Sequence, residues 1–194
     1  VEHLPMLIQP DGPEKVLIVG FGSGMSLNST LLHDPEVVEC LEIEPAVMET
    51  APLFESINNR CDLDPRAEII LNDARNHLLI ASGKYDVIIS EPSNPWMAGI
   101  SNLFTTEFYE LVKSRLNPEG IFCQWVQTYN MSPADFQMVV AGIRQVFPWV
   151  TLWNTIQGDI VLIASPDDLS LNLNRIQQRM KGSPALKTSL DRVY

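Results

Sequence analysis

Three glycines at alternate positions follow a short apolar run. The run is Val-Leu-Ile-Val at residues 16–19, and Gly20, Gly22 and Gly24 come directly after it, with Ser23 inside the turn. Glycine lets the chain turn sharply and lets a ligand approach the main chain, while a following helix presents its amino end. These residues predict a binding site for a small molecule. A tight strand-to-helix connection without any ligand would use the same glycines.

A carboxylate ends each of the next two apolar runs. Glu42 stands where a carboxylate can accept both hydroxyls of a ribose, and Asp73 stands where a short acidic side chain can receive the amino group of an adenine. Their neighbours Ile43 and Ala74 complete the predicted nucleoside contacts. Two simpler interpretations stay open. Glu42 could be a solvated charge at a strand end, and Asp73 could cap the helix that follows it.

The fourth apolar run ends in Glu91, which is the candidate for acid–base chemistry because ligands bind at the carboxyl ends of strands in open α/β sheets. Asn94 and Trp96 follow in a partial match to the N-P-P-Y/F/W turn with which amino-group methyltransferases hold a target nitrogen. Gln124 and Tyr129, near the fifth run, are predicted to reach the same site. Helix capping or ion pairing would equally explain Glu91, and ordinary packing would explain the others.

Alternating strands and helices must position these residues, and the pattern predicts a βαβ arrangement. The expected fold is α/β and Rossmann-like, the class I S-adenosylmethionine-dependent methyltransferase fold, with about seven strands in a mostly parallel sheet. An antiparallel hairpin closes it. The expected strands are 16–19, 37–44, 69–73, 85–91, 120–127, 150–155 and 159–164, and the expected helices are 45–54, 75–81, 106–116, 133–147 and 173–180. Residues 1–165 are predicted to form the catalytic domain and 166–194 a peripheral helix and tail.

The composition is that of an ordinary globular protein. The chain has 194 residues, 45% of them hydrophobic, and its net charge is −11. A chain of this length buries enough surface for one core, which argues against disorder. Without a basic patch, it lacks the electrostatic footprint for nucleic acid, whereas its negative field would attract small cations.

The cysteines and the apolar runs exclude further classes. Cys40, Cys61 and Cys123 form no C-x-x-C pair, so neither a disulfide framework nor a zinc site is expected, and no metal is predicted. No uninterrupted apolar run reaches the ~18 residues of a membrane span, and no signal peptide is present. The predicted location is therefore cytoplasmic. Because the chain starts at Val1, it is interpreted as a processed chain or a piece of a longer one.

Taken in order, the motifs resemble the spermidine/spermine synthase (polyamine aminopropyltransferase) family. The resemblance runs from about residue 3 to 165 and is most similar to a divergent branch whose synthase-like domain is often fused to membrane segments. The motifs that carry it are Val-Leu-Ile-Val-Gly-x-Gly-x-Gly at 16–24, Leu-Glu-Ile-Glu at 41–44, Asn-Asp at 72–73, Tyr-Asp-Val-Ile-Ile at 85–89 and Leu-Phe-Thr-x-Glu-Phe-Tyr at 103–109.

The resemblance implies roles for several residues and also shows three departures. It implies that Glu42 holds the ribose, that Asp73 holds the adenine and that the glycine turn holds the sulfonium-bearing tail. The family commonly has Asp where this chain has Ser23, Glu91 and Asn94. In the family, those carboxylates hold the amino group of the nucleoside and the amines of the acceptor. The three departures therefore leave open how this chain would bind an amine. By this resemblance, the chain is expected to begin after the family's small N-terminal β domain, which helps to close the active site.

Three functions fit these residues. The leading hypothesis is transfer of an aminopropyl group from decarboxylated S-adenosylmethionine to an amine acceptor in polyamine biosynthesis. The first alternative is an S-adenosylmethionine-dependent methyltransferase, and the second is an inactive domain that only binds a nucleoside. The expected partners are a nucleoside and a cationic amine, with no nucleic acid. A homodimer and a membrane-embedded parent protein are both compatible with the sequence.

Overall fold

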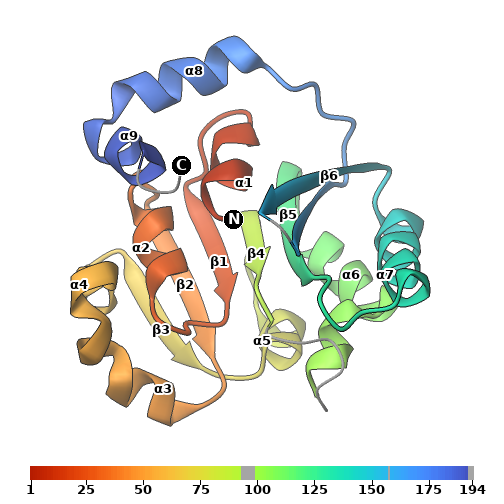
Figure 1. Ribbon diagram of the computed structural model, residues 1–194, viewed down its shortest axis with the longest axis horizontal. Helices are drawn as coiled ribbons and strands as arrows, with labels where there is room; N and C mark the ends of the chain where they lie inside the picture. Colours follow the sequence, from red (N-terminus) through yellow and green to blue (C-terminus); the bar gives the residue numbers. More distant parts are fainter. Residues whose placement is uncertain (93–98, 157, 192–194) are drawn as a thin grey trace.

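The most apolar segments form the centre of one mixed sheet. The computed structural model describes residues 1–92, 99–156 and 158–191. In these ranges, seven strands are hydrogen-bonded in the order β3-β2-β1-β4-β5-β7-β6 (Figure 1). The strands are β1 Lys15–Val19, β2 Val37–Glu42, β3 Ala67–Leu71, β4 Tyr85–Ser90, β5 Leu116–Gln127, β6 Trp149–Ile156 and β7 Asp159–Ser165.

Strand direction sets the location of the site. Strands β1 to β5 are parallel, and β7 pairs antiparallel with both β5 and β6, which confirms the predicted closing hairpin. The strand order reverses between β1 and β4. From β1 the chain continues to β2 on one side, and from β4 it continues to β5 on the other. Parallel strands end at one edge of the sheet, and ligands bind at such a reversal point.

The predicted helices are present with one interruption, and α1, α4 and α9 lie outside the predicted helix ranges. Residues 45–54, predicted as one helix, divide into α3 and a 3-10 turn, η1, since Pro52 has no N–H to continue the α-helical hydrogen bonding. No helix within the described ranges is both long and apolar enough to cross a membrane. The helices are α1 His3–Ile8, α2 Met25–Leu31, α3 Pro45–Thr50, η1 Ala51–Phe54, α4 Glu55–Asn58, η2 Cys61–Leu63, α5 Ala74–Ile80, η3 Ile100–Phe104, α6 Thr106–Ser114, α7 Pro133–Val146, α8 Leu173–Gly182 and α9 Pro184–Asp191.

Each face of the sheet has its own hydrophobic core. Successive strand residues point to opposite faces, so Val16 and Ile18 pack with α1 and α2, whereas Leu17 and Val19 pack with α5 to α7. The β1 residues 16–19 are at most 6% exposed. This confirms the prediction that β1 is buried on both faces, and it fixes the glycine turn at the end of a rigid strand.

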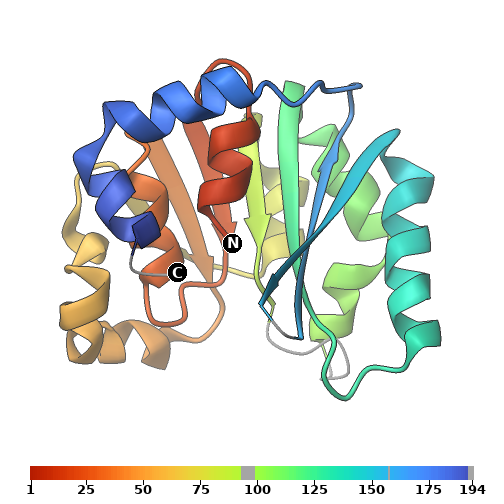
Figure 2. The same cartoon turned by 45° about the horizontal axis from the view of Figure 1, so that its top comes forward.

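The C-terminal helices lie against the N-terminal one. Figures 1 and 2 both show α8 beside α1. The guanidinium of Arg179 donates to the carbonyls of Gln9 at 2.5 Å and Pro10 at 2.9 Å, and Arg175 donates to the carbonyl of Ile8 at 3.3 Å. These arginines thus bind a carbonyl in the last turn of α1 and two carbonyls in the segment that directly follows it. The segment predicted as a peripheral tail therefore helps to hold α1 in place.

Candidate functional site

A cavity of about 760 Å³ lies at the carboxyl ends of the parallel strands. Its volume falls within the ~300–1,000 Å³ of ordinary small-molecule sites. The glycine turn forms one wall, and residues that follow β2, β3 and β4 form the others. The predicted site residues that line it are Gly20, Gly22, Ser23, Glu42, Ile43, Asp73, Ala74 and Glu91. Residues far apart in the sequence thus meet at the edge where ligands were expected.

The glycine turn has a backbone path that side chains would oppose. Gly20, Gly22 and Gly24 have φ angles of +100°, +55° and +83°. A Cβ at Gly24 would lie 2.8 Å from the Phe21 ring and 3.1 Å from Asn58. Gly24 therefore closes the turn against its surroundings, while Gly20 and Gly22 form the cavity wall. Both roles require glycine, the first because of packing and the second because of close approach.

Glu42 holds the site together as well as lining it. Its side chain is 8% exposed. Its Oε2 accepts a hydrogen bond from the N–H of Phe21 at 3.1 Å, and its Oε1 accepts from the N–H groups of Ile43 and Glu44 at 2.8 and 3.0 Å. A carboxylate offers about four acceptor positions, so about one remains on Oε2 for a ligand. We therefore expect one strong ribose contact, where the sequence suggested two.

Asp73 combines the two roles that its sequence position left open. Its Oδ1 accepts from the N–H of Asn76 at 2.9 Å, so Asp73 is the N-cap of α5. It also lines the cavity, as do its neighbour Ala74 and the exposed Ile43. The second carboxylate oxygen, Oδ2, accepts no hydrogen bond from the described residues, so it can accept from a donor such as an adenine amino group. Ala74 and Ile43 are apolar and suit the faces of a planar ring.

Glu91 accepts a hydrogen bond from Ser26, a residue that the sequence did not indicate. The hydroxyl of Ser26, in α2, lies 2.8 Å from Glu91 Oε2, and both residues line the cavity. Glu91 Oε1 is buried and has no hydrogen-bond partner among the described residues. Burial, and then the negative charge of Glu2, raise the pKa of the Glu91 carboxyl well above its ordinary value. A raised pKa is typical of carboxylates that move protons.

The predicted substrate-side residues are placed differently. Gln124 is fully buried, where its side-chain amide donates to the carbonyls of Ser90 and Trp125, and it does not line the cavity. Its neighbour Trp125 does line the cavity. Tyr129 is 51% exposed and is not part of the cavity wall. The remaining two, Asn94 and Trp96, lie outside the described residues.

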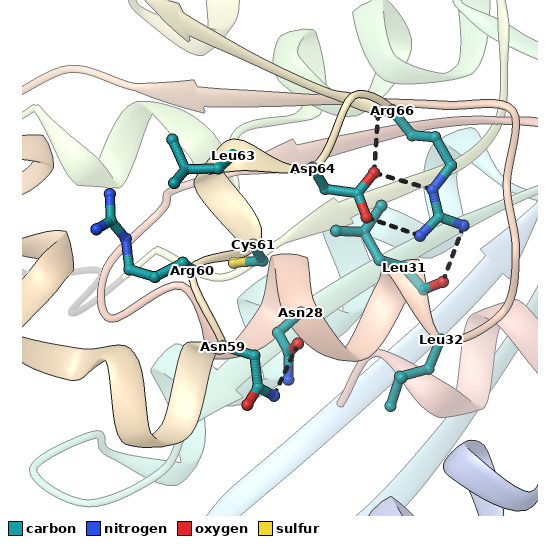
Figure 3. A pocket seen from close by; sticks show the side chains of 9 residues that line it. All are labelled: Asn28, Leu31, Leu32, Asn59, Arg60, Cys61, Leu63, Asp64 and Arg66. Carbon is teal, nitrogen blue, oxygen red and sulfur yellow. Dashed lines mark hydrogen bonds and ion pairs between the residues drawn. The ribbon is translucent and has the colours of Figure 1, made fainter.

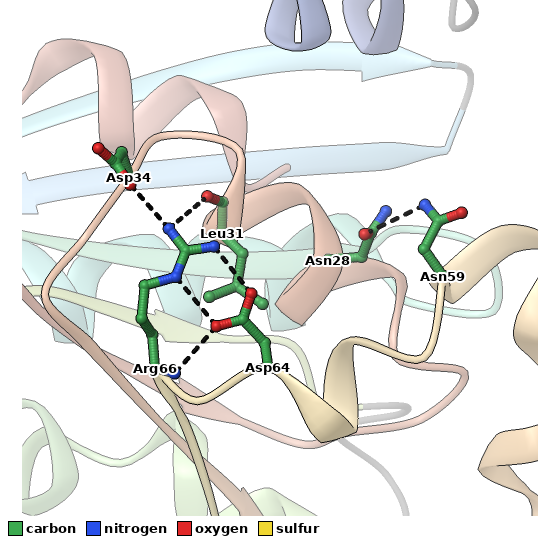
Figure 4. A network of polar contacts seen from close by, with 6 residues as sticks. All are labelled: Asn28, Leu31, Asp34, Asn59, Asp64 and Arg66. Carbon is green, nitrogen blue, oxygen red and sulfur yellow. Dashed lines mark hydrogen bonds and ion pairs between the residues drawn. The ribbon is translucent and has the colours of Figure 1, made fainter.

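A second hollow, of about 470 Å³, lies beside α2 and the segment that leads into β3 (Figure 3). Its charged groups pair with each other. Arg66 donates to both oxygens of Asp64 and to Asp34, as Figure 4 shows, and Arg60 pairs with Asp62. The cations are thus already neutralised by neighbouring carboxylates. The hollow offers no charged group comparable to Glu91 within the part of the chain that the structure describes.

Comparison with known proteins assigns the chain to a family. A family model described as "Spermine/spermidine synthase domain" matches residues 1–157. The chain belongs to this family. Its relatives include the polyamine aminopropyltransferases of Thermotoga neapolitana, 31% identical over 147 residues, and of Bacillus subtilis, 31% identical over 156 residues. These matches cover 75% and 79% of the chain, but 49% and 55% of the relatives. The chain therefore spans about half the length of these curated relatives.

Solved structures confirm the predicted fold for this spermine/spermidine synthase domain. A spermidine synthase in complex with the transition-state analogue AdoDATO has a TM-score of 0.78 and 26% identity, covering 94% of this chain and 62% of that chain. Human methyltransferase-like protein 13 in complex with SAH has a TM-score of 0.73 and 21% identity, covering 98% of this chain and 89% of that chain. The second likeness shows the fold alone.

Proposed function

We propose that this domain transfers an aminopropyl group from decarboxylated S-adenosylmethionine to an amine acceptor. The observation that carries the proposal is the meeting of Glu42, Asp73 and Glu91 on one cavity beside the glycine turn. The names of the polyamine aminopropyltransferase relatives support it. So does the spermidine synthase structure in complex with a transition-state analogue.

Nucleoside binding would use the three walls of the cavity. Glu42 would accept a ribose hydroxyl through the free position on Oε2, and Asp73 would accept from the adenine through Oδ2. Gly20 and Gly22 would let the sulfonium-bearing tail pass close to the main chain. No metal is part of the proposal. Among the described residues, no group of three or more His, Cys, Asp or Glu side chains is placed to hold one.

The amine acceptor must lose a proton before it can react. An alkylammonium ion has a pKa of about 10.4, so at neutral pH it has no lone pair with which to attack. In the proposed step, Glu91 takes that proton and the neutral nitrogen attacks the carbon beside the sulfonium. The nitrogen–carbon bond forms as the carbon–sulfur bond breaks, and the bonding pair stays on sulfur as a neutral thioether. Alignment of the three atoms can supply roughly 7–11 kcal/mol of the barrier reduction.

Methyl transfer is the second candidate function, and one relative favours it. A putrescine N-methyltransferase of Nicotiana tabacum is 31% identical over 149 residues, 76% of this chain and 39% of the relative. That protein's name joins an amine substrate to methyl transfer. The same cavity and the same proton acceptor would serve either reaction. What differs is the tail of the nucleoside, which carries a carboxylate only in intact S-adenosylmethionine.

The remaining partner predictions follow from this proposal. The substrates are a nucleoside and a cationic amine. The net charge of −11 would attract the cationic amine to the protein. A homodimer, a cytoplasmic location, the absence of nucleic acid and a membrane-embedded parent protein stay predictions. So does the division of the chain at residue 165.

Ser23 gives the proposal its test of ligand preference, because it lines the cavity beside the glycine turn. A carboxylate here would attract the ammonium of decarboxylated S-adenosylmethionine and repel the α-carboxylate of the intact form, whereas serine does neither strongly. Ser23→Asp should therefore raise preference for the decarboxylated form about tenfold. A charge pair at ~4 Å and an effective dielectric of ~20 contributes up to about 4 kcal/mol before the cost of desolvation. A tenfold change in preference corresponds to about 1.4 kcal/mol, which is well below that limit.

The measurement is calorimetric titration of both nucleosides into wild type, Ser23→Asp and the neutral control Ser23→Asn. Wild type should discriminate weakly and the control should match it. Wild type that already prefers the decarboxylated form by about 100-fold or more would show that another group reads the amine. Binding of intact S-adenosylmethionine alone would instead favour methyl transfer.

A further inference from the structure

A second carboxylate stands behind the cavity wall. Glu2, which precedes α1, accepts a hydrogen bond through Oε1 from the Ser26 hydroxyl at 2.8 Å, the same distance at which that hydroxyl reaches Glu91. Ser26 and Glu91 line the cavity, but Glu2 does not. One hydroxyl has one proton, so it can donate to only one of the two carboxylates at a time. The other carboxyl group can form a hydrogen bond with the Ser26 oxygen only if that carboxyl group itself holds a proton.

The carboxyl groups of Glu2 and Glu91 also interact directly. Glu91 Oε1 has no partner among the described residues, although a buried carboxylate oxygen normally has one. A side-chain hydrogen bond with Glu2 contributes to raising the Glu91 pKa, and two carboxyl groups can form such a bond only when one of them holds a proton. The two acidic groups can therefore share a proton, and Glu91 lies on the wall of the proposed substrate site.

We propose that Glu2 is a positioning residue for the reaction, and that the unit Glu2–Ser26–Glu91, rather than Glu91 alone, takes up the proton that the amine acceptor releases. The inference rests on the proposed function. In the step, the ammonium nitrogen loses its proton to the Glu91 carboxylate and keeps the bonding pair, which then attacks the carbon beside the sulfonium. The proton leaves to solvent after the product amine departs.

The charges around Glu91 explain why Glu2 matters. Burial, the charge of Glu2 and a side-chain hydrogen bond with Glu2 raise the Glu91 pKa, while the Ser26 hydrogen bond lowers it. A carboxylate with an ordinary pKa is a poor acceptor for a proton held with a pKa of about 10.4. By raising the Glu91 pKa, Glu2 brings the proton acceptor nearer the operating pH, where general bases work best.

Two buried thiols also lie near Glu91. The buried thiols of Cys40 in β2 and Cys123 in β5 lie within its electrostatic reach, and burial raises the pKa of each, so both stay neutral. Residues 93–98, which follow Glu91 in the chain, are Ser, Asn, Pro, Trp, Met and Ala, with no titratable side chain among them. Glu2 is therefore the carboxylate whose removal should most change the titration of Glu91.

Two variants should move the titration of Glu91 in opposite directions. Glu2→Gln removes the neighbouring negative charge, so the Glu91 pKa should fall, and the acid limb of kcat/KM should move to lower pH with it. Ser26→Ala removes a hydrogen bond that favours the ionised form, so the limb should move to higher pH. Glu2→Asp should restore part of the wild-type profile.

The experiment combines pH–rate profiles with carbon NMR titration of labelled glutamate side chains in the same variants. Glu36→Gln is the matched control, because Glu36 is exposed and lies before the amino end of β2, opposite the cavity. Its profile should match wild type. If Glu2→Gln and Ser26→Ala both leave the Glu91 titration in place, or move it the same way, the inference is wrong.

The NMR arm separates this inference from the proposed function. If no product forms from either nucleoside, the proposed function fails, yet the opposite shifts of the Glu91 resonance would still show the coupling. If product forms and neither the resonance nor the acid limb responds to Glu2→Gln, the proposed function stands and Glu2 has no part in it. Circular dichroism of each folded variant excludes unfolding as the cause.

Discussion

Glu91→Gln should lower turnover about 100-fold or more while changing nucleoside affinity less than about twofold. The amide keeps the size of the side chain and can still accept from Ser26, but it cannot take a proton. Because the change also removes the repulsion between Glu91 and Glu2, the variant should be at least as stable as wild type. Lost activity could then not be blamed on misfolding.

The test of Glu91 is initial-rate kinetics at saturating nucleoside, with thermal unfolding measured on the same samples. Glu110→Gln is the control, since Glu110 is an exposed residue of α6 and the substitution removes the same charge. It should leave turnover within about twofold of wild type. If Glu91→Gln retained full turnover in a working assay, Glu91 would have no part in proton transfer.

Glu42→Ala should weaken nucleoside binding roughly 10- to 100-fold. One hydrogen bond to a charged group contributes about 1.5–3 kcal/mol, and each 1.4 kcal/mol is a factor of ten. The truncation also leaves the N–H groups of Phe21, Ile43 and Glu44 without their acceptor, so the glycine turn and the end of β2 should lose part of their fixed geometry. The loss of affinity therefore has a direct part and a part that acts through the turn.

Glu44→Ala is the matched control for that measurement. Glu44 is exposed, lies two residues further along the chain and caps α3 by accepting from the N–H of Ala46 at 3.0 Å. Its loss should cost about 1 kcal/mol of stability, as the loss of an N-cap does, and leave methylthioadenosine affinity within about twofold. Equal affinities for wild type and Glu42→Ala, measured by calorimetry below the unfolding range, would contradict the ribose assignment.

The fold was predictable because its central signals are local. Apolar runs of strand length, each followed by a turn or a helix, determine parallel strands buried on both faces, as residues 16–19 show. Helix ends were less predictable. Helix α1 is only six residues long and has no side-chain cap, so its existence depends on packing against the sheet and on the arginines of α8.

The site was predictable in its position but not in its contacts. Residues at the carboxyl ends of parallel strands must meet, which is why Glu42, Asp73 and Glu91 share a cavity. Gln124, which was predicted to reach the site, is buried and does not line the cavity. Alternate residues of a strand face opposite ways, so Gln124 and Trp125 could not both reach the cavity, and the structure places Trp125 there.

Contacts between distant residues carried no sequence signal. Ser26 follows the glycine turn, but nothing in the sequence indicates that its hydroxyl reaches Glu2 and Glu91, which lie 24 and 65 residues away. The three backbone contacts of Glu42 likewise depend on the path of the turn. Such contacts decide how strongly a carboxylate holds a proton or a ligand, so they require the structure.

Product identity tests the central claim most directly. The folded chain is incubated with a diamine and either decarboxylated or intact S-adenosylmethionine, and the nucleoside products are identified by mass spectrometry. Aminopropyl transfer predicts 5′-methylthioadenosine together with the aminopropylated amine, formed from the decarboxylated nucleoside and lost in Glu91→Gln. S-adenosylhomocysteine and a methylated amine, formed from the intact nucleoside alone, would contradict it.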